Sequence, residues 1–393
     1  MPSEKRRPLF EIWPELEPRL GFLALGDFPT PIEPLARLSG ADARFAADTY
    51  VKRDDLSSPL YGGNKVRTLE ALLGQARRDE RSVVFATGAY GSNHAVATAL
   101  HAQRAGFRTG VALFPQPRSE TAIANLRVSL TQADEIVDLP HWSLLPWFMW
   151  RRTRGGRAGA TRSFIMPPGG AIPRGCLGFL SAGLELAQQV ERGLMPPPEE
   201  VVIALGSTCS TAGLLVGLKL AARLGLGWGQ SAQGARPGRR ADGAPLLVAV
   251  RVTPWPVTSV FRVVSLALRV SSWLASLTGS PLFQLSRAEL SEGLSVDGSQ
   301  LGPGYGRPTV AGLAAIERLG PFAAALDTTY AAKSAAGLLA RNERRPAVRL
   351  FWSTKSSVPL PPVPADRLAR APARMRRWLE RGGGFDASSP PSR

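Results

Sequence analysis

Short apolar runs alternate with helical stretches along most of this 393-residue chain. The runs are brief, and turn residues bound several of them, so they predict buried strands. These runs are 82–87, 109–114, 201–205, 246–252 and 348–352. Helical patterns follow two of them, one to about residue 105 and one over 212–224. This alternation predicts an α/β protein with mostly parallel sheets, in which ligands bind beyond the carboxyl ends of the strands.

Composition favours an intracellular globular protein. The chain is 44% hydrophobic and 20% charged, which suits a sizeable core in two or three domains. Its two cysteines are too few for a disulfide framework, and no signal peptide is expected, so a cytoplasmic setting is predicted. The most apolar long stretch, 257–283, contains Arg262 and Arg269, so no membrane span is expected.

The net charge of +17 raises nucleic acid or an anionic membrane surface as a partner. The arginines are scattered, however, and two local clusters, at 151–162 and 236–240, lie in loops rich in glycine and alanine. Specific nucleic-acid binding is therefore not expected. A basic, glycine-rich insertion is predicted at 225–244, and a disordered tail at 383–393. The aromatic segment 139–150 is interpreted first as core, then as a subunit contact, then as a membrane-surface contact.

One lysine is conspicuous in the segment LYGGNKVRT, which covers residues 60–68. The chain has only 6 lysines among its 48 basic residues. A lysine retained in an arginine-rich chain suggests a need for an amine, because arginine cannot be deprotonated to attack a carbonyl. Lys65 is therefore the candidate nucleophile, although a solvated lysine at a helix start would look the same.

Two loops after predicted strands are suited to binding a ligand. The loop 88–94, GAYGSNH, leads into a helix at Ser92, which is also an ordinary N-cap residue. The loop 206–213, GSTCSTAG, places several hydroxyls before a helix N-terminus and predicts a phosphate cradle. Metal-ligand spacing, a GxGxxG pattern and a GxSxG elbow are all missing from the sequence. An amine, a phosphate cradle and an α/β pattern together favour pyridoxal 5'-phosphate as cofactor.

These pieces resemble the 1-aminocyclopropane-1-carboxylate deaminase / D-cysteine desulfhydrase family of pyridoxal-phosphate enzymes, within the tryptophan synthase β-like superfamily. The resemblance runs from about Phe28 to Pro361. Its motifs occur in family order: KRDDLSSPLYGGNKVRTLE, GSNHA, PPGGAIPRGCLGF, GSTCSTAGLLVGL, GPGYGRP, LDTTYAAKSAAGL and LFWSTKSS. It implies a two-domain fold type II enzyme with twisted sheets flanked by helices. The larger domain would comprise 1–67 and 181–382, with 68–180 inserted as the smaller one, and the enzyme would be a homodimer.

The resemblance also implies residue roles. Lys65 would carry the cofactor, Asn93 would bond its ring hydroxyl, and Ser92 would meet the substrate carboxylate. Two tyrosines would face the substrate, and with lowered pKa values such phenols exchange protons. These are Tyr305 and Tyr330. The phosphate would be held by Gly206, Ser207, Thr208, Cys209, Ser210 and Thr211, and Thr354 would lie at the cofactor's edge.

Several positions depart from the family pattern. Thr68 stands where a second lysine is usual, Gly91 where glutamine is common, and Thr208 and Cys209 where glycine is common. The β-carbons at 208 and 209 would crowd the phosphate or demand another loop path. Lys355 beside the cofactor's ring would be unusual.

The implied activity is β-elimination from a small amino acid, as in D-cysteine desulfhydrase, which gives pyruvate, ammonia and sulfide. Thr354 favours this activity. Ala331 stands where the deaminases tend to have glutamate, which argues against 1-aminocyclopropane-1-carboxylate deaminase, the alternative. A family member with impaired catalysis that acts as a binding protein, and a basic nucleic-acid or membrane-surface protein, are the readings from other classes.

Overall fold

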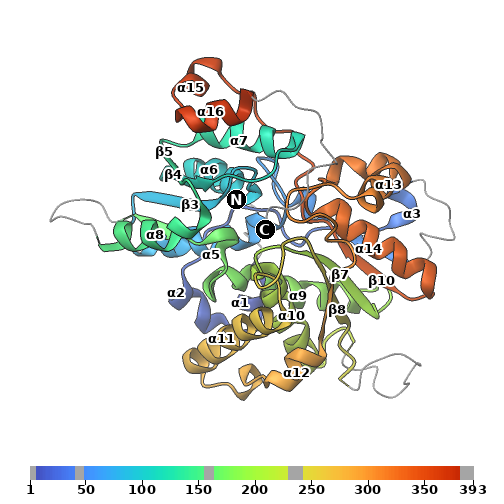
Figure 1. The fold of residues 1–393 in the computed structure, drawn as a ribbon. Coiled ribbons are helices and arrows are strands. Elements are labelled where there is room, and N and C mark those ends of the chain that lie inside the picture. Colours follow the sequence, from blue (N-terminus) through green and yellow to red (C-terminus); the bar gives the residue numbers. More distant parts are fainter. Residues whose placement is uncertain (1–5, 40–47, 155–162, 229–241, 381–393) are drawn as a thin grey trace.

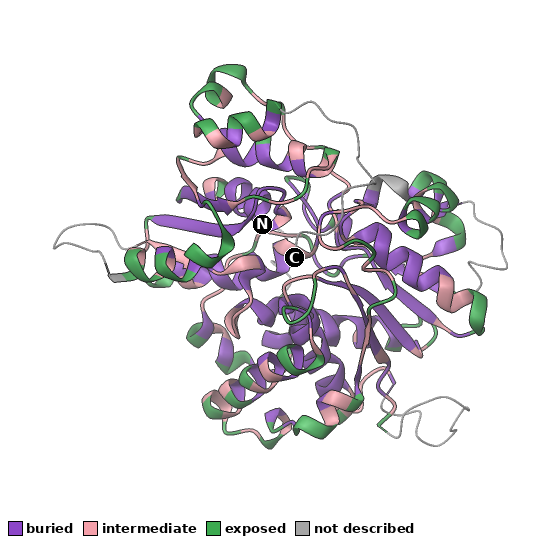
Figure 2. Ribbon diagram, viewed as in Figure 1, coloured by how far each residue is buried: buried purple, intermediate pink, exposed green. Residues whose placement is uncertain are grey.

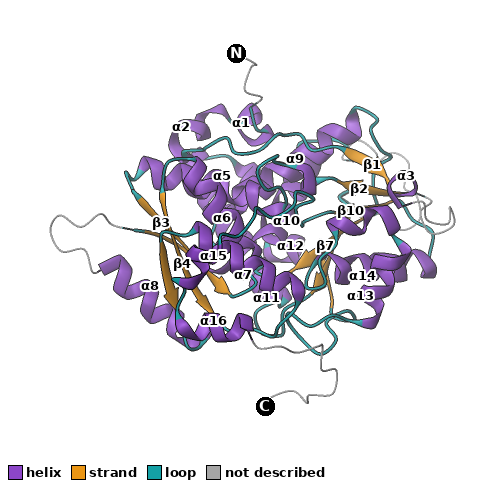
Figure 3. Ribbon diagram, turned by 90° about the horizontal axis from the view of Figure 1, so that it is seen from above, coloured by secondary structure: helices purple, strands orange, loops and turns teal. Residues whose placement is uncertain are grey.

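The computed structural model describes residues 6–39, 48–154, 163–228 and 242–380. Most of the predicted basic insertion, and the whole predicted tail, lie outside these residues. The described chain forms two sheets with helices between and around them (Figures 1 and 3). The prediction of an α/β protein with mostly parallel sheets is confirmed.

The larger sheet has six strands in the order β1-β2-β10-β7-β8-β9. Only β1 runs antiparallel to its neighbour, β2. The strands are β1 (Ile32–Pro34), β2 (Thr49–Lys52), β7 (Glu200–Leu205), β8 (Leu246–Arg251), β9 (Leu294–Asp297) and β10 (Arg349–Trp352). Three of the predicted strands, at 201–205, 246–252 and 348–352, are confirmed here as β7, β8 and β10.

The smaller sheet has four parallel strands in the order β5-β4-β3-β6. They are β3 (Val83–Ala89), β4 (Arg108–Phe114), β5 (Glu135–Asp138) and β6 (Phe164–Met166). The predicted strands at 82–87 and 109–114 are therefore also confirmed. Every residue of β3 is buried, which explains why its sequence reads as a continuous apolar run rather than an alternating one.

Helices cover both sheets. Those used below are α5 (Asn64–Arg78), α6 (Asn93–Arg104), α7 (Glu120–Gln132), α8 (Leu145–Arg154), α9 (Leu177–Glu191), α10 (Cys209–Arg223), α11 (Val260–Thr278) and α14 (Ala331–Arg344). The others are α1 (Pro8–Ile12), α2 (Glu17–Leu20), α3 (Leu35–Ser39), α12 (Arg287–Glu292), α13 (Val310–Arg318), α15 (Ala365–Ala369) and α16 (Ala373–Glu380). The helix predicted at 212–224 is confirmed, but it begins earlier, at Cys209.

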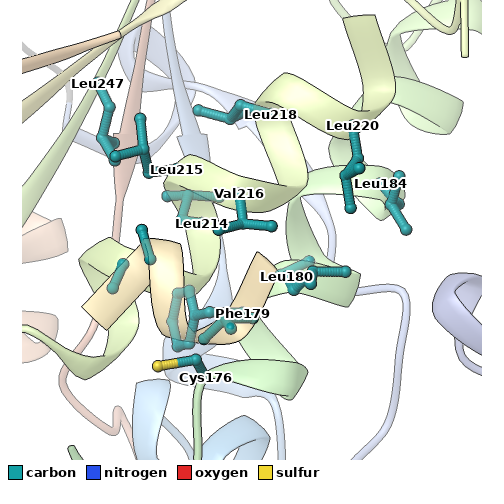
Figure 4. Packing of buried hydrophobic residues seen from close by; sticks show 14 of the residues in the cluster. Cys176, Phe179, Leu180, Leu184, Leu214, Leu215, Val216, Leu218, Leu220 and Leu247 are labelled. Carbon is teal, nitrogen blue, oxygen red and sulfur yellow. The ribbon is translucent and has the colours of Figure 1, made fainter. Parts of the chain in front are cut away.

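The largest apolar cluster forms where α9 packs against α10 (Figure 4). Gly217 permits the close approach, because a β-carbon there would lie 2.2 Å from the carbonyl oxygen of Leu180. Close packing of this pair matters for the site, since α10 begins at the predicted phosphate loop. The core therefore holds the helix N-terminus in place (purple in Figure 2).

The two C-terminal helices lie against α7 and the smaller sheet (Figure 1). Arg374 on α16 pairs with Asp138 at the end of β5, and the Trp378 ring packs on Tyr90 at 5.3 Å. These helices belong to the larger domain in the predicted division, 1–67 with 181–382. That division and the inserted domain 68–180 stay a prediction.

Two apolar segments that the sequence singled out have distinct surroundings. Helix α11 is long and apolar enough to cross a membrane by those criteria alone, yet it packs on α10 and buries Val263 and Val270. In segment 139–150, Leu139, Leu145 and Phe148 are buried, as the core interpretation requires. Its tryptophans are instead exposed: Trp142, Trp147 and Trp150.

Candidate active site

Lys65 lies on the first turn of α5 and lines a cavity of about 650 Å³. The turn before it needs glycine: Gly63 has φ 94°, and a β-carbon there would lie 2.6 Å from the carbonyl oxygen of Thr354. Within the described residues, no hydrogen bond or ion pair ends on the Lys65 amine. Burial lowers the pKa of this amine, which favours the neutral, nucleophilic form.

The cavity collects nearly all of the predicted site residues. They come from the ends of β3, β7 and β10, from the start of α5, and from the loops before α10, α13 and α14, so the cavity lies where strands of both sheets end. The predicted residues that line it are Lys65, Ser92, Asn93, Gly206, Ser207, Thr208, Ser210, Thr211, Tyr305, Tyr330 and Thr354. The exception is Cys209, whose Sγ lies 3.2 Å from the carbonyl oxygen of Gly170 and faces Cys176.

The loop before α10 has the features of an anion site. Thr208 occupies the N-cap position but makes no side-chain cap, so the first N–H groups of the helix have no capping side chain. Hydroxyls of Ser207, Ser210 and Thr211 line the same part of the cavity, and Asn64 donates to the Ser210 oxygen at 3.0 Å. A helix of this length with uncapped donors favours a phosphate.

The backbone of this loop explains how side chains replace the usual glycines. Thr208 adopts the left-handed conformation, with φ 71°, so the glycine-like path is kept at a cost in strain. The Cys209 side chain avoids the cavity by pointing into the core. The expected crowding at 209 is therefore absent, and the left-handed path at 208 is strained instead.

The loop before α6 is built differently, because its helix is capped. The Ser92 hydroxyl accepts the Ala95 N–H at 3.2 Å, so the ordinary N-cap interpretation is confirmed for this residue. Asn93 accepts from Asn125 at 2.7 Å and from Tyr61 at 3.4 Å, both through Oδ1. The Asn93 Nδ2 group is thus the part of the carboxamide left to donate to a ligand.

The two tyrosines meet at the cavity wall, with 2.6 Å between their hydroxyl oxygens, and the Tyr330 ring lies next to Gly206 of the phosphate loop. Asp327 holds the backbone of Tyr330 by accepting its N–H at 2.7 Å. Burial raises the pKa of Tyr305 to about 12, and burial and Tyr305 raise the pKa of Tyr330 well above its ordinary value. The expectation of lowered phenol pKa values is wrong for the protein alone. At Tyr305 burial outweighs the hydrogen bond with Tyr330, and at Tyr330 both burial and that hydrogen bond raise the pKa.

Two departures from the family pattern, Thr68 and Lys355, and the motif residue His94 lie in or beside the cavity. Thr68 is buried on α5, and its hydroxyl has no partner within the described residues. His94 lines the cavity with both ring nitrogens unpartnered there, and burial, with Lys65 nearby, lowers its pKa to about 3. The Lys355 amine donates to the carbonyl oxygen of Ser356 at 3.1 Å and does not line the cavity.

Sequence reasoning missed several residues of this cavity. Asn64 precedes Lys65 directly, and His94 follows Asn93, so proximity to a motif could have found both. Trp142 and Trp255 line the opening but lie far from any motif. The only signal for Trp255 was an aromatic residue in a loop just after a strand, where parallel sheets bind ligands.

Together these groups fit a phosphorylated aldehyde. An unpaired amine suits the aldehyde, an uncapped helix N-terminus suits the phosphate, and the His94 ring nitrogens line the cavity without a partner in the described residues. The fold and the site therefore define an enzyme of the pyridoxal-phosphate class.

Comparison with known proteins supports this assignment to the pyridoxal-phosphate enzymes. The chain belongs to the family of pyridoxal-phosphate dependent enzymes, whose model matches residues 23–344. It is 30% identical to D-cysteine desulfhydrase of Salmonella typhimurium over 338 residues, covering 82% of this chain and 88% of that enzyme. It resembles a crystal structure of an ACC deaminase homologue with TM-score 0.67 and 25% identity, covering 89% of this chain and 95% of the other.

A third relative is matched over a shorter stretch. The chain is 38% identical over 187 residues to nocardicin C-9' epimerase of Nocardia uniformis subsp. tsuyamanensis. The match covers 47% of this chain and 57% of that enzyme. The cofactor of this family is pyridoxal phosphate, and the predicted family, fold class and cofactor are confirmed.

Proposed function

We propose that this enzyme eliminates the β-substituent of a cysteine-like amino acid, as D-cysteine desulfhydrase does. One cysteine and one water would give pyruvate, ammonium and hydrogen sulfide. The observation that carries the proposal is a single cavity that joins the unpaired Lys65 amine, an uncapped helix N-terminus and a phenol pair 2.6 Å apart. The match along most of the desulfhydrase supports it.

In this proposal Ser207, Thr208, Ser210 and Thr211 hold the phosphate at the start of α10, and Asn93 Nδ2 meets the ring hydroxyl. Gly206 supports the loop, the Cys209 side chain holds it to the core, and Thr354 lies at the ring's edge. The bound cofactor supplies an electron sink that stabilises negative charge at the substrate's α-carbon.

The chain's own groups then move the protons. Ser92 and the first N–H groups of α6 receive the substrate carboxylate. The Lys65 amine, which burial helps to keep neutral, accepts the proton from the α-carbon. Tyr305 and Tyr330 stay protonated because their pKa values are raised, so the pair is suited to donate a proton to the departing sulfur.

A second candidate, 1-aminocyclopropane-1-carboxylate deaminase, is supported by the similar crystal structure. Against it, Ala331 is buried at the start of α14 with no carboxylate to offer. A catalytically impaired member is supported by the unpartnered Thr68 hydroxyl and the strained Thr208.

The test uses full-length protein loaded with pyridoxal phosphate. D-cysteine, L-cysteine and 1-aminocyclopropane-1-carboxylate are assayed for keto acid, ammonia and sulfide. Keto acid with sulfide from one cysteine enantiomer supports elimination, whereas 2-oxobutyrate from the cyclic amino acid would replace it with deamination. Exchange of the α-hydrogen in D₂O without keto acid would indicate epimerisation, and no reaction at all would favour an impaired member.

We further propose that the enzyme is a cytoplasmic homodimer. Its two cysteines are free, which suits a reducing compartment. Val310 and Leu313 lie one turn apart on α13 and are 88% and 49% exposed, so they form an apolar strip that suits a subunit contact. Sedimentation of the holoenzyme tests the dimer. A monomer at micromolar concentration would contradict it.

A further inference from the structure

The outer part of the cofactor cavity is apolar and aromatic. Trp142 precedes α8 beside the smaller sheet, and Trp255 lies in the loop after β8 of the larger sheet. Both line the cavity, yet their side chains are 60% and 72% exposed. They therefore stand at its opening, one contributed from each sheet's side of the molecule.

Other apolar groups continue this surface inward. Val257 adds to the exposed rim, and the less exposed Phe114 and Leu145 also line the cavity, which further contains the hydrogen-bonding groups of Ser92, the phosphate loop and the tyrosines. The described lining contains no carboxylate, and its lysine and arginine side chains are Lys65, whose pKa burial lowers, and the exposed Arg262. Such an opening favours an uncharged apolar group over a cationic one.

A bound cysteine would be too small to contact the apolar surface around Trp142 and Trp255. Its thiol is small and would be engaged by the tyrosines that lie beside the cofactor groups. Two exposed indoles at the mouth of one cavity form an apolar surface of the kind that marks a contact with a ligand or partner. A cavity of about 650 Å³ is in the range that encloses a drug-sized ligand, which leaves room beyond a small amino acid.

We propose that the substrate is an amino acid whose β-sulfur carries a bulky aryl or arylalkyl group, which lies between Trp142 and Trp255. This rests on the proposed function and names the substrate class of the same site. The substrate's Cβ–S bond breaks, the Cα proton is removed, and the sulfur takes a proton from the tyrosine pair. One water then completes the release of pyruvate and ammonium, so the products are an aryl or arylalkyl thiol, pyruvate and ammonium.

The experiment compares S-benzylcysteine with cysteine, each as both enantiomers, using the loaded full-length enzyme. The wild type is expected to favour S-benzylcysteine in kcat/KM by about tenfold. Trp255→Ala and Trp142→Ala are each expected to lower that preference about tenfold, through the apolar and aromatic contact that is lost. Trp147→Ala is the matched control, because Trp147 is 53% exposed on α8 but does not line the cavity.

Binding is measured separately from turnover. The carbon isostere of S-benzylcysteine has no leaving group, so its Kd, measured by calorimetry, reports contact alone. We expect Trp142→Ala and Trp255→Ala to weaken it about tenfold and Trp147→Ala to leave it unchanged. Circular dichroism confirms that each variant is folded.

The outcomes separate the two proposals. Turnover of cysteine with no preference for the benzyl group, and no effect of either tryptophan, overturns the substrate class but leaves elimination standing. Tryptophan-dependent binding of the isostere without any elimination keeps the aryl site and removes the proposed reaction. If the tryptophan variants change the sedimentation coefficient instead of the Kd, the surface is a subunit contact and the inference is wrong.

Discussion

Two buried lysines on neighbouring segments have opposite surroundings. The Lys52 amine at the end of β2 donates to the carbonyl oxygen of Thr30 at 2.6 Å and to Gln189 at 2.7 Å, and it pairs with Glu185. The Lys65 amine has no partner within the described residues and faces the cavity. Lys52 belongs to a closed network of buried charges that includes Arg67, Asp54 and Glu185.

The difference separates a structural charge from a reactive one. A buried ion that is fully paired contributes to a single fold and is costly to disrupt. A buried amine without partners destabilises the protein unless it is neutral or bound to a ligand, which is what a lysine that reacts with an aldehyde requires. Substitutions at the two positions should therefore affect different measurements.

The largest expected effect is at Lys65. Lys65→Met removes the amine that holds the cofactor and accepts the α-proton, so kcat/KM should fall by roughly 10⁴-fold. The visible absorbance of the bound cofactor should lose its covalent component. Unfolding by urea should be no easier than in the wild type, because no paired charge is broken. Unchanged turnover would show that Lys65 has no catalytic role.

Lys52→Met should instead lower the stability of the protein. It leaves Glu185 with one fewer cation in a buried network, which should lower the free energy of unfolding by about 3–5 kcal/mol. Urea unfolding of the apoprotein measures the loss, with Lys65→Met as the matched buried-lysine control. Equal stability of the two variants would contradict the comparison.

The same network predicts a pH dependence. Burial alone would raise the pKa of Glu185, but Arg67 and Lys52 lower it from 4.5 to about 2. Its stabilising contribution is therefore complete above pH 4.5 and is lost as the pH falls from there towards 2, by about 3 kcal/mol in total. Unfolding free energies across this range should fall more steeply in the wild type than in Glu185→Gln. Parallel curves would show that Glu185 is not the group responsible.

Local patterns explain what the sequence predicts well. The strands β3, β4, β7, β8 and β10 follow from short apolar runs, because burial on both faces requires them. The loops that hold Lys65 and the phosphate follow from glycine and hydroxyl residues before helices, since strand ends and helix starts are encoded over a few residues.

Features that depend on distant partners were not predictable in this way. The Cys209 side chain points away from the cavity because its thiol donates to the carbonyl oxygen of Gly170 and contacts the Cys176 sulfur. The tyrosine pKa values rise because the surrounding chain buries both phenols. Trp142 and Trp255 share one opening only because the two sheets bring their loops together.

The smallest expected effect concerns the phosphate loop. A threonine with φ 71° costs about 1–2 kcal/mol in strain, and glycine removes that strain but adds up to about 1 kcal/mol of unfolded-state entropy. Thr208→Gly should therefore stabilise the apoprotein by about 0.5–1 kcal/mol and should not weaken phosphate binding. Thr211→Gly is the control, because Thr211 is buried inside α10, where glycine costs about 1 kcal/mol relative to alanine and the contacts of the threonine side chain are also lost. Opposite signs for the two variants in urea unfolding would locate the strain at Thr208, and equal losses would show that the loop is relaxed with threonine in place.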